Sequence, residues 1–245
     1  MLHRPLGRRS YASTWDLQLQ VREKLKGGLD AEPDVLLTVE HPPVLTAGRR
    51  AGPKNLLLSP EEARALGVDI QHIERGGDWT YHGPGQLVAY PIVALRRRGL
   101  SVKGYVAALE DAMQSVASRV LTAAGCDGIV TLRRRCGAPG LWAMRADETE
   151  MKLGAVGVHV SRGVTIHGLA LNLNTEPWGF SWIVPCGLVG AETSSLGRLV
   201  REFGGDEAAI PTVEEAGQWL MDVLPSCLLA HARGGRVRGD SVPST

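Results

Sequence analysis

The sequence has almost no net charge and few cysteines. Lys and Arg together number 27 of the 245 residues, and Asp and Glu number 26, so the formal net charge is +1. A nucleic-acid-binding domain usually carries a larger basic excess, which disfavours that class. The four cysteines have neither the paired spacing of a zinc site nor the density of a disulfide scaffold. We therefore expect a protein of the reducing cytoplasm that binds neither nucleic acid nor a metal ion.

Long apolar runs are also missing. No stretch approaches the roughly 18 consecutive apolar residues of a membrane-spanning helix, and the basic N-terminus has no apolar segment of signal-peptide length. The 44% of hydrophobic and 22% of charged residues are ordinary for a globular chain. We expect no association with a membrane, one catalytic domain over residues 1–231, and a disordered tail over 232–245, which lacks apolar periodicity.

Helical and extended patterns alternate along the chain. The spacing of apolar residues and the capping signals predict helices over 11–28, 60–66 and 101–124 and a last helix that begins at Thr212. Strands are predicted near 35–39, 68–74, 86–95, 128–132, 140–144, 152–160 and 164–173. Several neighbouring strands are joined by short turns, as at 161–163. This pattern predicts an α/β protein, close to α+β, with a mixed, largely antiparallel sheet packed by helices.

A glycine-rich segment at 75–86 is the first candidate for chemistry. It reads RGGDWTYHGPGQ and contains four glycines and a proline. Glycine lets a backbone approach a ligand closely, and the side chains alternate between polar groups and rings that suit the wall of an apolar pocket. The spacing of the common phosphate-binding loops is missing. A tight connection between two strands, with His82 as a structural residue, explains the pattern equally well.

Two later segments place small residues on strands. Lys152 begins the run KLGAVGVHV, where an inward-facing lysine would be desolvated and its pKa lowered, although exposure at a strand end is the commoner fate. Gly168 and Ala170 are two residues apart and therefore share one strand face. The trough that they leave suits a linear acyl chain, or else the close packing of another backbone.

Two cysteines compete for the role of a nucleophile. Cys186 lies between a proline and a glycine, which favours a rigid, exposed turn. Cys136 follows three arginines, whose positive charge would favour a thiolate. The other two cysteines lie at or within helix patterns and are interpreted as packing residues. On these local grounds Cys186 is only moderately favoured over Cys136.

Together these segments resemble the octanoyltransferase family of lipoate biosynthesis, also called lipoyl(octanoyl) transferases. The resemblance extends from about Asp34 to Leu196 and rests on EHPPVLTAGR at 40–49, RGGDWTYHGPGQLVAYPI at 75–92, KLGAVGVHV at 152–160, HGLALNLN at 167–174 and PCGL at 185–188. Several long motifs in the same order are far more specific than any one of them. The resemblance implies a fold similar to the catalytic module of biotin and lipoate protein ligases.

The resemblance also implies an activity and its partners. Members of the family move an octanoyl group from acyl carrier protein to a lysine of lipoyl domains, which belong to 2-oxoacid dehydrogenase complexes and the glycine-cleavage H protein. No cofactor is implied, because the phosphopantetheine of acyl carrier protein delivers the octanoyl (or lipoyl) group. We expect the protein to act as a monomer.

The family's functional residues fall on defined positions of this sequence. Its nucleophile falls on Cys186 and its activating lysine on Lys152. Its acyl-binding residues fall on Arg75, Gly76, Gly77, Asp78, Trp79, Thr80, Tyr81 and His82, on Ala155, Val156 and Gly157, and on His167, Gly168, Leu169 and Ala170. Trp79 is a bulky departure from the family's pattern, and we expect it to alter the shape of the acyl pocket.

The implied chemistry is an exchange of thioesters followed by formation of an amide. A free thiol with a pKa near 8.5 is only a few per cent ionised at pH 7. An ammonium about 4 Å away is worth roughly 4 kcal/mol at an effective dielectric of about 20, and a third of that lowers the pKa of the thiol by about one unit. We expect Lys152 to stabilise the Cys186 thiolate and to shuttle protons, and His82 and His167 to shape the pocket.

Three rival functions remain. An ATP-dependent lipoate or biotin ligase would share the fold, but the sequence has no GRGRxGR-type nucleotide segment. An amidotransferase between lipoyl domains and a non-catalytic protein that binds acyl carriers are the others. Arginine clusters at 49–50, 96–98 and 133–135 are candidates for a rim that docks acidic partners, and solvated charge explains them equally well.

Overall fold

A mixed sheet of eight strands forms the centre of the protein. The computed structural model describes residues 1–26, 32–184 and 192–232. The strands of this sheet are β1 (Leu2–Arg8), β2 (Val35–Glu40), β6 (Gln86–Ile92), β7 (Thr131–Arg133), β8 (Gly140–Met144), β9 (Glu150–Ser161), β10 (Val164–Asn172) and β11 (Glu192–Thr193). Their order is β1-β2-β6-β10-β9-β8-β7, and β11 pairs with β9. Only the β1–β2 and β9–β11 pairs are parallel, which confirms the predicted mixed, largely antiparallel sheet.

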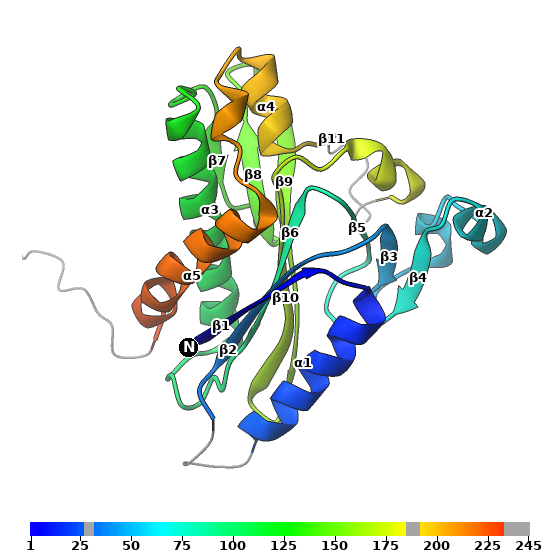
Figure 1. Ribbon diagram of the computed structural model, residues 1–245, viewed down its shortest axis with the longest axis vertical. Coiled ribbons are helices and arrows are strands. Elements are labelled where there is room, and N and C mark those ends of the chain that lie inside the picture. The colour runs from blue at the N-terminus through cyan, green and yellow to red at the C-terminus, as the bar shows by residue number, and fades with distance from the viewer. Residues whose placement is uncertain (27–31, 185–191, 233–245) are drawn as a thin grey trace, which may run out of the picture.

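Helices cover both faces of this sheet. They are α1 (Tyr11–Leu25), α3 (Val102–Ala123), α4 (Leu196–Glu202) and α5 (Val213–Ala230), whereas α2 (Pro60–Ala65) packs on a second, smaller sheet. α3 and α5 lie on one face of the sheet, and α1 lies on the other (Figure 1). In the described part of the chain no helix is long and apolar enough to cross a membrane.

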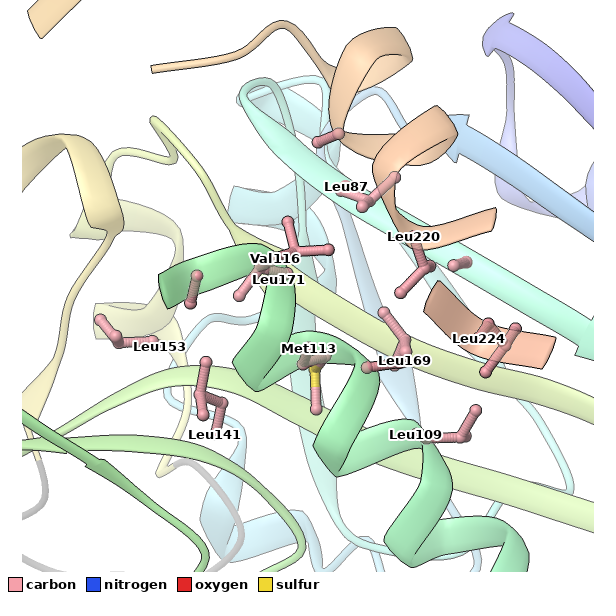
Figure 2. Packing of buried hydrophobic residues seen from close by; sticks show 14 of the residues in the cluster. Leu87, Leu109, Met113, Val116, Leu141, Leu153, Leu169, Leu171, Leu220 and Leu224 are labelled. Carbon is pink, nitrogen blue, oxygen red and sulfur yellow. The ribbon is translucent and has the colours of Figure 1, made fainter. Parts of the chain in front are cut away.

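The largest cluster of buried side chains lies between the sheet and the helices α3 and α5. Met113 and Val116 of α3 face Leu169 and Leu171 of β10, and Leu220 of α5 closes the same layer (Figure 2). The apolar stripe on α3 has the spacing that the sequence predicts for a helix packed on one side. This layer holds β9 and β10 rigidly from behind, so their opposite face can carry a site.

A second, smaller sheet lies beside the first. It has the order β4-β3-β5 and consists of β3 (Val44–Ala47), β4 (Asp69–His72) and β5 (Trp79–His82). Trp79 and Tyr81 point into its own apolar cluster, where the ring of Tyr81 contacts those of Phe180 and Trp182. Three short 3-10 helices complete the described elements: η1 (Pro53–Asn55), η2 (Pro177–Trp182) and η4 (Glu207–Ala209).

The structure contains elements that the sequence had not predicted, and one predicted helix is shorter than expected. Strands β1, β3, β5 and β11 and helix α4 had not been expected. β1 is an edge strand that pairs with β2. Its side chains are mostly exposed, so its sequence does not alternate between apolar and polar residues and gives no strand signal. α1 ends at Leu25, before the expected end of that helix. The expected C-terminal tail lies, apart from Ala232, outside the described residues.

Candidate active site

A cavity of about 410 Å³ lies between the two sheets and contacts most of the predicted site residues. Its volume is within the range of about 300–1,000 Å³ that is usual for small-ligand sites. Of the predicted residues it is lined by Arg75, Gly76, Gly77, Asp78, Thr80, His82, Lys152, Ala155, Val156, Gly157, His167, Gly168, Leu169 and Ala170. Residues from three separate stretches of the chain, 75–82, 152–157 and 167–170, therefore meet at one space.

Trp79 and Tyr81 do not line this cavity, contrary to their assignment as acyl-binding residues. Side chains alternate along β5, so Thr80 and His82 face the cavity while Trp79 and Tyr81 face the core of the small sheet. The indole Nε1 of Trp79 donates to the carbonyl of Gly52 at 3.0 Å. Trp79 therefore acts on the cavity only through the position of β5, and not as a bulky part of its wall.

A bulge in β9 brings Lys152 to the cavity. Strict alternation would put Lys152 on the face opposite to Ala155, because the two are three residues apart. In the pairing with β8, however, Leu141 lies opposite Gly154 and the next residue, Trp142, lies opposite Lys152, so Leu153 is an extra residue. Such a bulge turns two successive side chains to one side. Lys152 and Ala155 consequently share the face that lines the cavity.

The side chain of Lys152 is enclosed there. It is buried to all but 8% of its surface, and its Nζ lies 5.2 Å from the centre of the Trp142 ring. An aromatic face at that distance attracts a cation. The partly desolvated lysine that the sequence allowed, rather than an exposed strand end, is what the structure contains.

The glycines of the 75–78 loop let that loop cross the edge of β9. Gly76 N donates to the carbonyl of Val158 at 3.0 Å, and a Cβ on Gly157 would lie 3.0 Å from Arg75 Cδ. Gly77 adopts a φ of 93°, which favours glycine. The guanidinium of the buried Arg75 donates to the carbonyl of Thr46 at 2.7 Å and so ties the loop to β3.

The trough on β10 has two different origins. Ala170 contributes a small apolar wall to the cavity. A Cβ on Gly168 would collide with the carbonyl of Ala89 on β6, so this glycine is needed for the close approach of another backbone. Both alternatives that the sequence left open for this pair therefore apply: both residues line the cavity, and Gly168 also permits the close packing of β6.

The rings of Tyr11, Tyr90 and His167 line the cavity, and His41 lies behind them. Tyr90 contacts His41 Nε2 through its hydroxyl at 2.9 Å, and His41 Nδ1 lies 2.7 Å from the carbonyl of Arg9. The hydroxyl of Tyr11 lies 3.3 Å from Nδ1 of His167. Tyr11, His41 and Tyr90 were absent from the predicted site, and only the resemblance over 40–49 had drawn attention to His41. No local pattern could have found Tyr11, since it comes from helix α1.

Burial keeps these histidines neutral. It lowers the pKa of His41 to about 4 and that of His82 to about 3, and it also lowers the pKa of His167. The positive charge of Arg75 adds to the effect at His82 and His167. A histidine with so low a pKa takes up no proton near pH 7, so His82 is unsuited to the role of a general base.

Of the two candidate nucleophiles, only Cys136 lies within the described residues. Cys186 lies outside the described residues, which end at Val184 and resume at Glu192. Cys136 is exposed and does not line the cavity, although the next three residues do. Cys126 is buried at the end of α3, as expected of a packing residue. In the described ranges no group of three or more histidines, cysteines or acidic residues is arranged to hold a metal ion.

Most of the clustered arginines are engaged within the protein. Arg97 and Arg98 contact the buried carboxylate of Asp34 at 2.8 Å and 2.6 Å. The cluster at 133–135 pairs with acidic residues of α3 and β9. Arg50, by contrast, lines the cavity, and its neighbour Arg49 is exposed. Of the three clusters, the one at 49–50 is therefore best placed to meet a partner.

Comparison with known proteins identifies the family. The profile of the lipoyl protein ligase A/B catalytic domain matches residues 10–216. The chain belongs to this family. It is 42% identical to an octanoyltransferase of Desulfotalea psychrophila, over 82% of this chain and 83% of that one. It is 39% identical to an octanoyltransferase of Chloroflexus aurantiacus, over 85% of this chain and 95% of the other. The octanoyltransferase class expected from the sequence is thereby confirmed.

Solved structures show the same fold. A lipoate-protein ligase A bound with ATP superposes with a TM-score of 0.62 at 12% identity, over 93% of this chain and 86% of that one. The bipartite lipoate protein ligase of Thermoplasma acidophilum, studied with its E2 lipoyl domain, gives a TM-score of 0.57 at 12% identity, over 93% of this chain and 84% of that one. At such identities the likeness establishes the fold, and it confirms the predicted similarity to lipoate protein ligases.

Proposed function

We propose that the protein transfers an octanoyl group from acyl carrier protein to a lysine of lipoyl domains through a thioester on Cys186. Acyl carrier protein and the lipoyl domains are then its partners, the protein acts as a monomer, and no resident cofactor takes part. The observation that carries the proposal is the bulge in β9, which puts Lys152 on the wall shared by the acyl-binding stretches.

Both ends of the segment that contains Cys186 are anchored near this wall. Val184 N donates to the carbonyl of Asn55 at 2.9 Å, and the side chain of Asn55 donates to Asp78, which lines the cavity. On the other side, Thr193 of β11 pairs with Lys152 itself. The anchoring supports a meeting of Cys186 and Lys152.

The chemistry that follows uses a thiolate and one proton carrier. The Cys186 thiolate attacks the octanoyl thioester, the C–S bond to the carrier breaks, and Lys152 protonates the departing phosphopantetheine thiolate. The lysine amine of the lipoyl domain then attacks the new thioester, and the neutral Lys152 accepts its proton. Lys152 next gives that proton to the leaving sulfur of Cys186 or keeps it beside the thiolate. No ATP is consumed, because the donor is already activated.

Transfer without ATP tests this function. The protein is incubated with octanoyl acyl carrier protein and a lipoyl domain, and the octanoyl adduct of the domain is measured by intact mass. We expect transfer in the absence of ATP. An absolute requirement for ATP would instead favour a ligase, and binding of the carrier without any transfer would favour a non-catalytic protein. Transfer from one lipoyl domain to another, with no activity on the carrier, would favour an amidotransferase.

A further inference from the structure

His82 heads a chain of side-chain hydrogen bonds that leads away from the cavity. Its Nδ1 lies 2.6 Å from Gln86 Oε1. Gln86 Nε2 donates to Asn172 Oδ1 at 2.8 Å and to the carbonyl of Tyr81 at 3.3 Å. Asn172 Nδ2 in turn donates to the carbonyl of Ser194 at 2.9 Å. All three side chains are buried, so these bonds have no competition from bulk water.

Two backbone carbonyls set the direction of this chain. A carbonyl oxygen can only accept, so the amide nitrogens of Asn172 and Gln86 must face Ser194 and Tyr81 respectively. Gln86 Oε1 therefore faces His82, and Nδ1 of the ring must carry the proton that it donates to this oxygen. The neutral ring consequently has its lone pair on Nε2.

The lone pair on Nε2 of His82 faces the cavity. His82 lines the cavity, and among the described residues no hydrogen bond reaches its Nε2. The ring is held in place by Tyr11, which stacks on it at 6.0 Å with an interplanar angle of 14°. His82 thus presents an oriented acceptor to whatever occupies the space.

The same series of hydrogen bonds ends at β9, the strand that carries Lys152. Ser194 N donates to the carbonyl of Lys152 at 3.0 Å. Gln86, Asn172 and Lys152 also line one small void of about 20 Å³, and Thr80 lines both this void and the main cavity. His82 and Lys152 both line the main cavity, and the hydrogen bonds of Gln86 and Asn172 connect the position of one with the strand of the other.

We propose that Gln86 and Asn172 are positioning residues that hold His82 with its Nε2 lone pair toward the cavity, where it accepts a hydrogen bond from the attacking lysine amine of the lipoyl domain. The inference rests on the proposed function. As the amine attacks, the N–C bond forms and the C–S bond to Cys186 breaks. One proton of the amine passes to Lys152 and on to sulfur, while the other N–H stays bonded to His82, which gains no proton. The bond to His82 aims the lone pair of the amine at the thioester.

The surroundings of His82 keep it an acceptor throughout the working pH range. Burial lowers its pKa to about 3. The groups that face it are Tyr11 from α1, His41 after β2, Arg75 from the glycine-rich loop and His167 from β10, and the last three disfavour an added positive charge. The imidazole therefore complements the lysine: His82 orients the amine, and Lys152 takes its proton.

Separate measurement of the two half-reactions tests the inference. In Gln86→Leu, formation of the octanoyl enzyme from the carrier and its aminolysis by a saturating lipoyl domain are each followed by rapid quench and intact mass. We expect aminolysis to slow about 10- to 100-fold more than acylation, in kcat rather than in the KM for the domain. Gln218→Leu, at an exposed position of α5, should change neither rate. Equal slowing of both steps, or of neither, would overturn the inference.

The tautomer of His82 can be read in the unaltered protein. Two-bond ¹⁵N–¹³C–¹H correlations of ¹⁵N-labelled imidazole should show His82 protonated on Nδ1 at pH 7, and a proton on Nε2 would refute the hydrogen-bond chain. This result does not depend on how a variant folds. If the unaltered protein forms no octanoyl thioester at all, the proposed function fails; if it does and Gln86→Leu behaves normally, only the positioning role fails.

Discussion

At the scale of single residues, the setting of Lys152 matters most. Its ammonium lies in a buried position beside Trp142, where water screens its charge little. This ammonium would therefore stabilise a nearby thiolate more strongly than an exposed ammonium would. The role of Lys152 can therefore be measured on the thiol itself, without any turnover.

Lys152→Ala should raise the pKa of the Cys186 thiol. We expect the midpoint of alkylation by iodoacetamide, followed against pH by mass mapping of the peptide that contains Cys186, to move up by about one unit. The rate at pH 7 should then fall about tenfold, since the thiolate is the reactive form. Lys103→Ala, at an exposed position on α3, serves as the control. An unchanged midpoint in Lys152→Ala would contradict the activation role.

Ala170 offers a direct probe of the acyl cavity. Ala170→Leu adds a larger side chain to the cavity wall beside Ala155, with which Ala170 pairs. We expect the variant to lose octanoyl transfer by at least about tenfold while it retains transfer of butanoyl or hexanoyl groups. A series of acyl carrier thioesters measures this. An unaltered preference for octanoyl would place the acyl chain outside this cavity.

The sequence predicted which residues surround the cavity better than it predicted their orientation. Resemblance placed the whole 75–82 stretch at the site, but alternation along an unexpected strand turns Trp79 and Tyr81 away from it. Tyr11 escaped prediction because its place at the site depends on how α1 packs on the sheet. Such contacts between distant segments leave no local pattern in one sequence.

At the scale of elements, the bulge in β9 decides whether the site exists. Without the extra Leu153, Lys152 would point into the layer under α3, where an ammonium would be buried among apolar side chains. Gly154 permits the bulge, because a Cβ there would lie 2.9 Å from the carbonyl of Ala170 and 3.0 Å from Met113 Sδ.

Gly154→Ala should therefore disturb both stability and activity. We expect the free energy of unfolding in urea to fall by about 1–3 kcal/mol, because the added methyl would press on the carbonyl of Ala170 and on Met113. The rate of acylation should fall as well, since Lys152 moves with the strand. Gly52→Ala, whose Cβ would have a single neighbour within 4 Å among the described residues, at 3.8 Å, should change stability by less than about 0.5 kcal/mol. Full stability in Gly154→Ala would show that β9 accommodates the bulge in another way.

Elements with strong periodicity were predicted well, and those defined by pairing were not. The apolar stripe over 102–120 gave α3 close to its observed bounds, and the capping box at Thr212 gave the start of α5. β1 and β5 lack such signals and are strands only because β2 and β3 supply hydrogen-bond partners. A bulge, similarly, is visible only in the register between two strands.

At the scale of the whole molecule, buried neutral histidines make stability depend on pH. His41 and His82 ordinarily titrate near 6.5, but burial lowers their pKa values to about 4 and about 3. Between these values the unfolded chain binds protons that the folded protein does not. Acid therefore favours unfolding, and this loss begins as the pH falls below about 6.5.

The free energy of unfolding should fall by about 1 kcal/mol per pH unit for each such histidine between pH 6.5 and pH 4.5. Urea titrations at several pH values measure this slope. His41→Gln removes one of these groups and should reduce the slope, whatever it does to stability at pH 7. A stability that is flat from pH 7 to pH 5 would contradict the burial of neutral imidazoles.

The central claim is that Cys186 carries the acyl group. Its most direct test is to incubate the protein with octanoyl acyl carrier protein alone, without ATP or acceptor, and to map the adduct by peptide mass spectrometry. We expect one octanoyl group on Cys186, released by neutral hydroxylamine and absent from Cys186→Ser, while Cys136→Ser acylates normally. An octanoyl group on Cys136, or a labile adduct that persists in Cys186→Ser, would contradict the account.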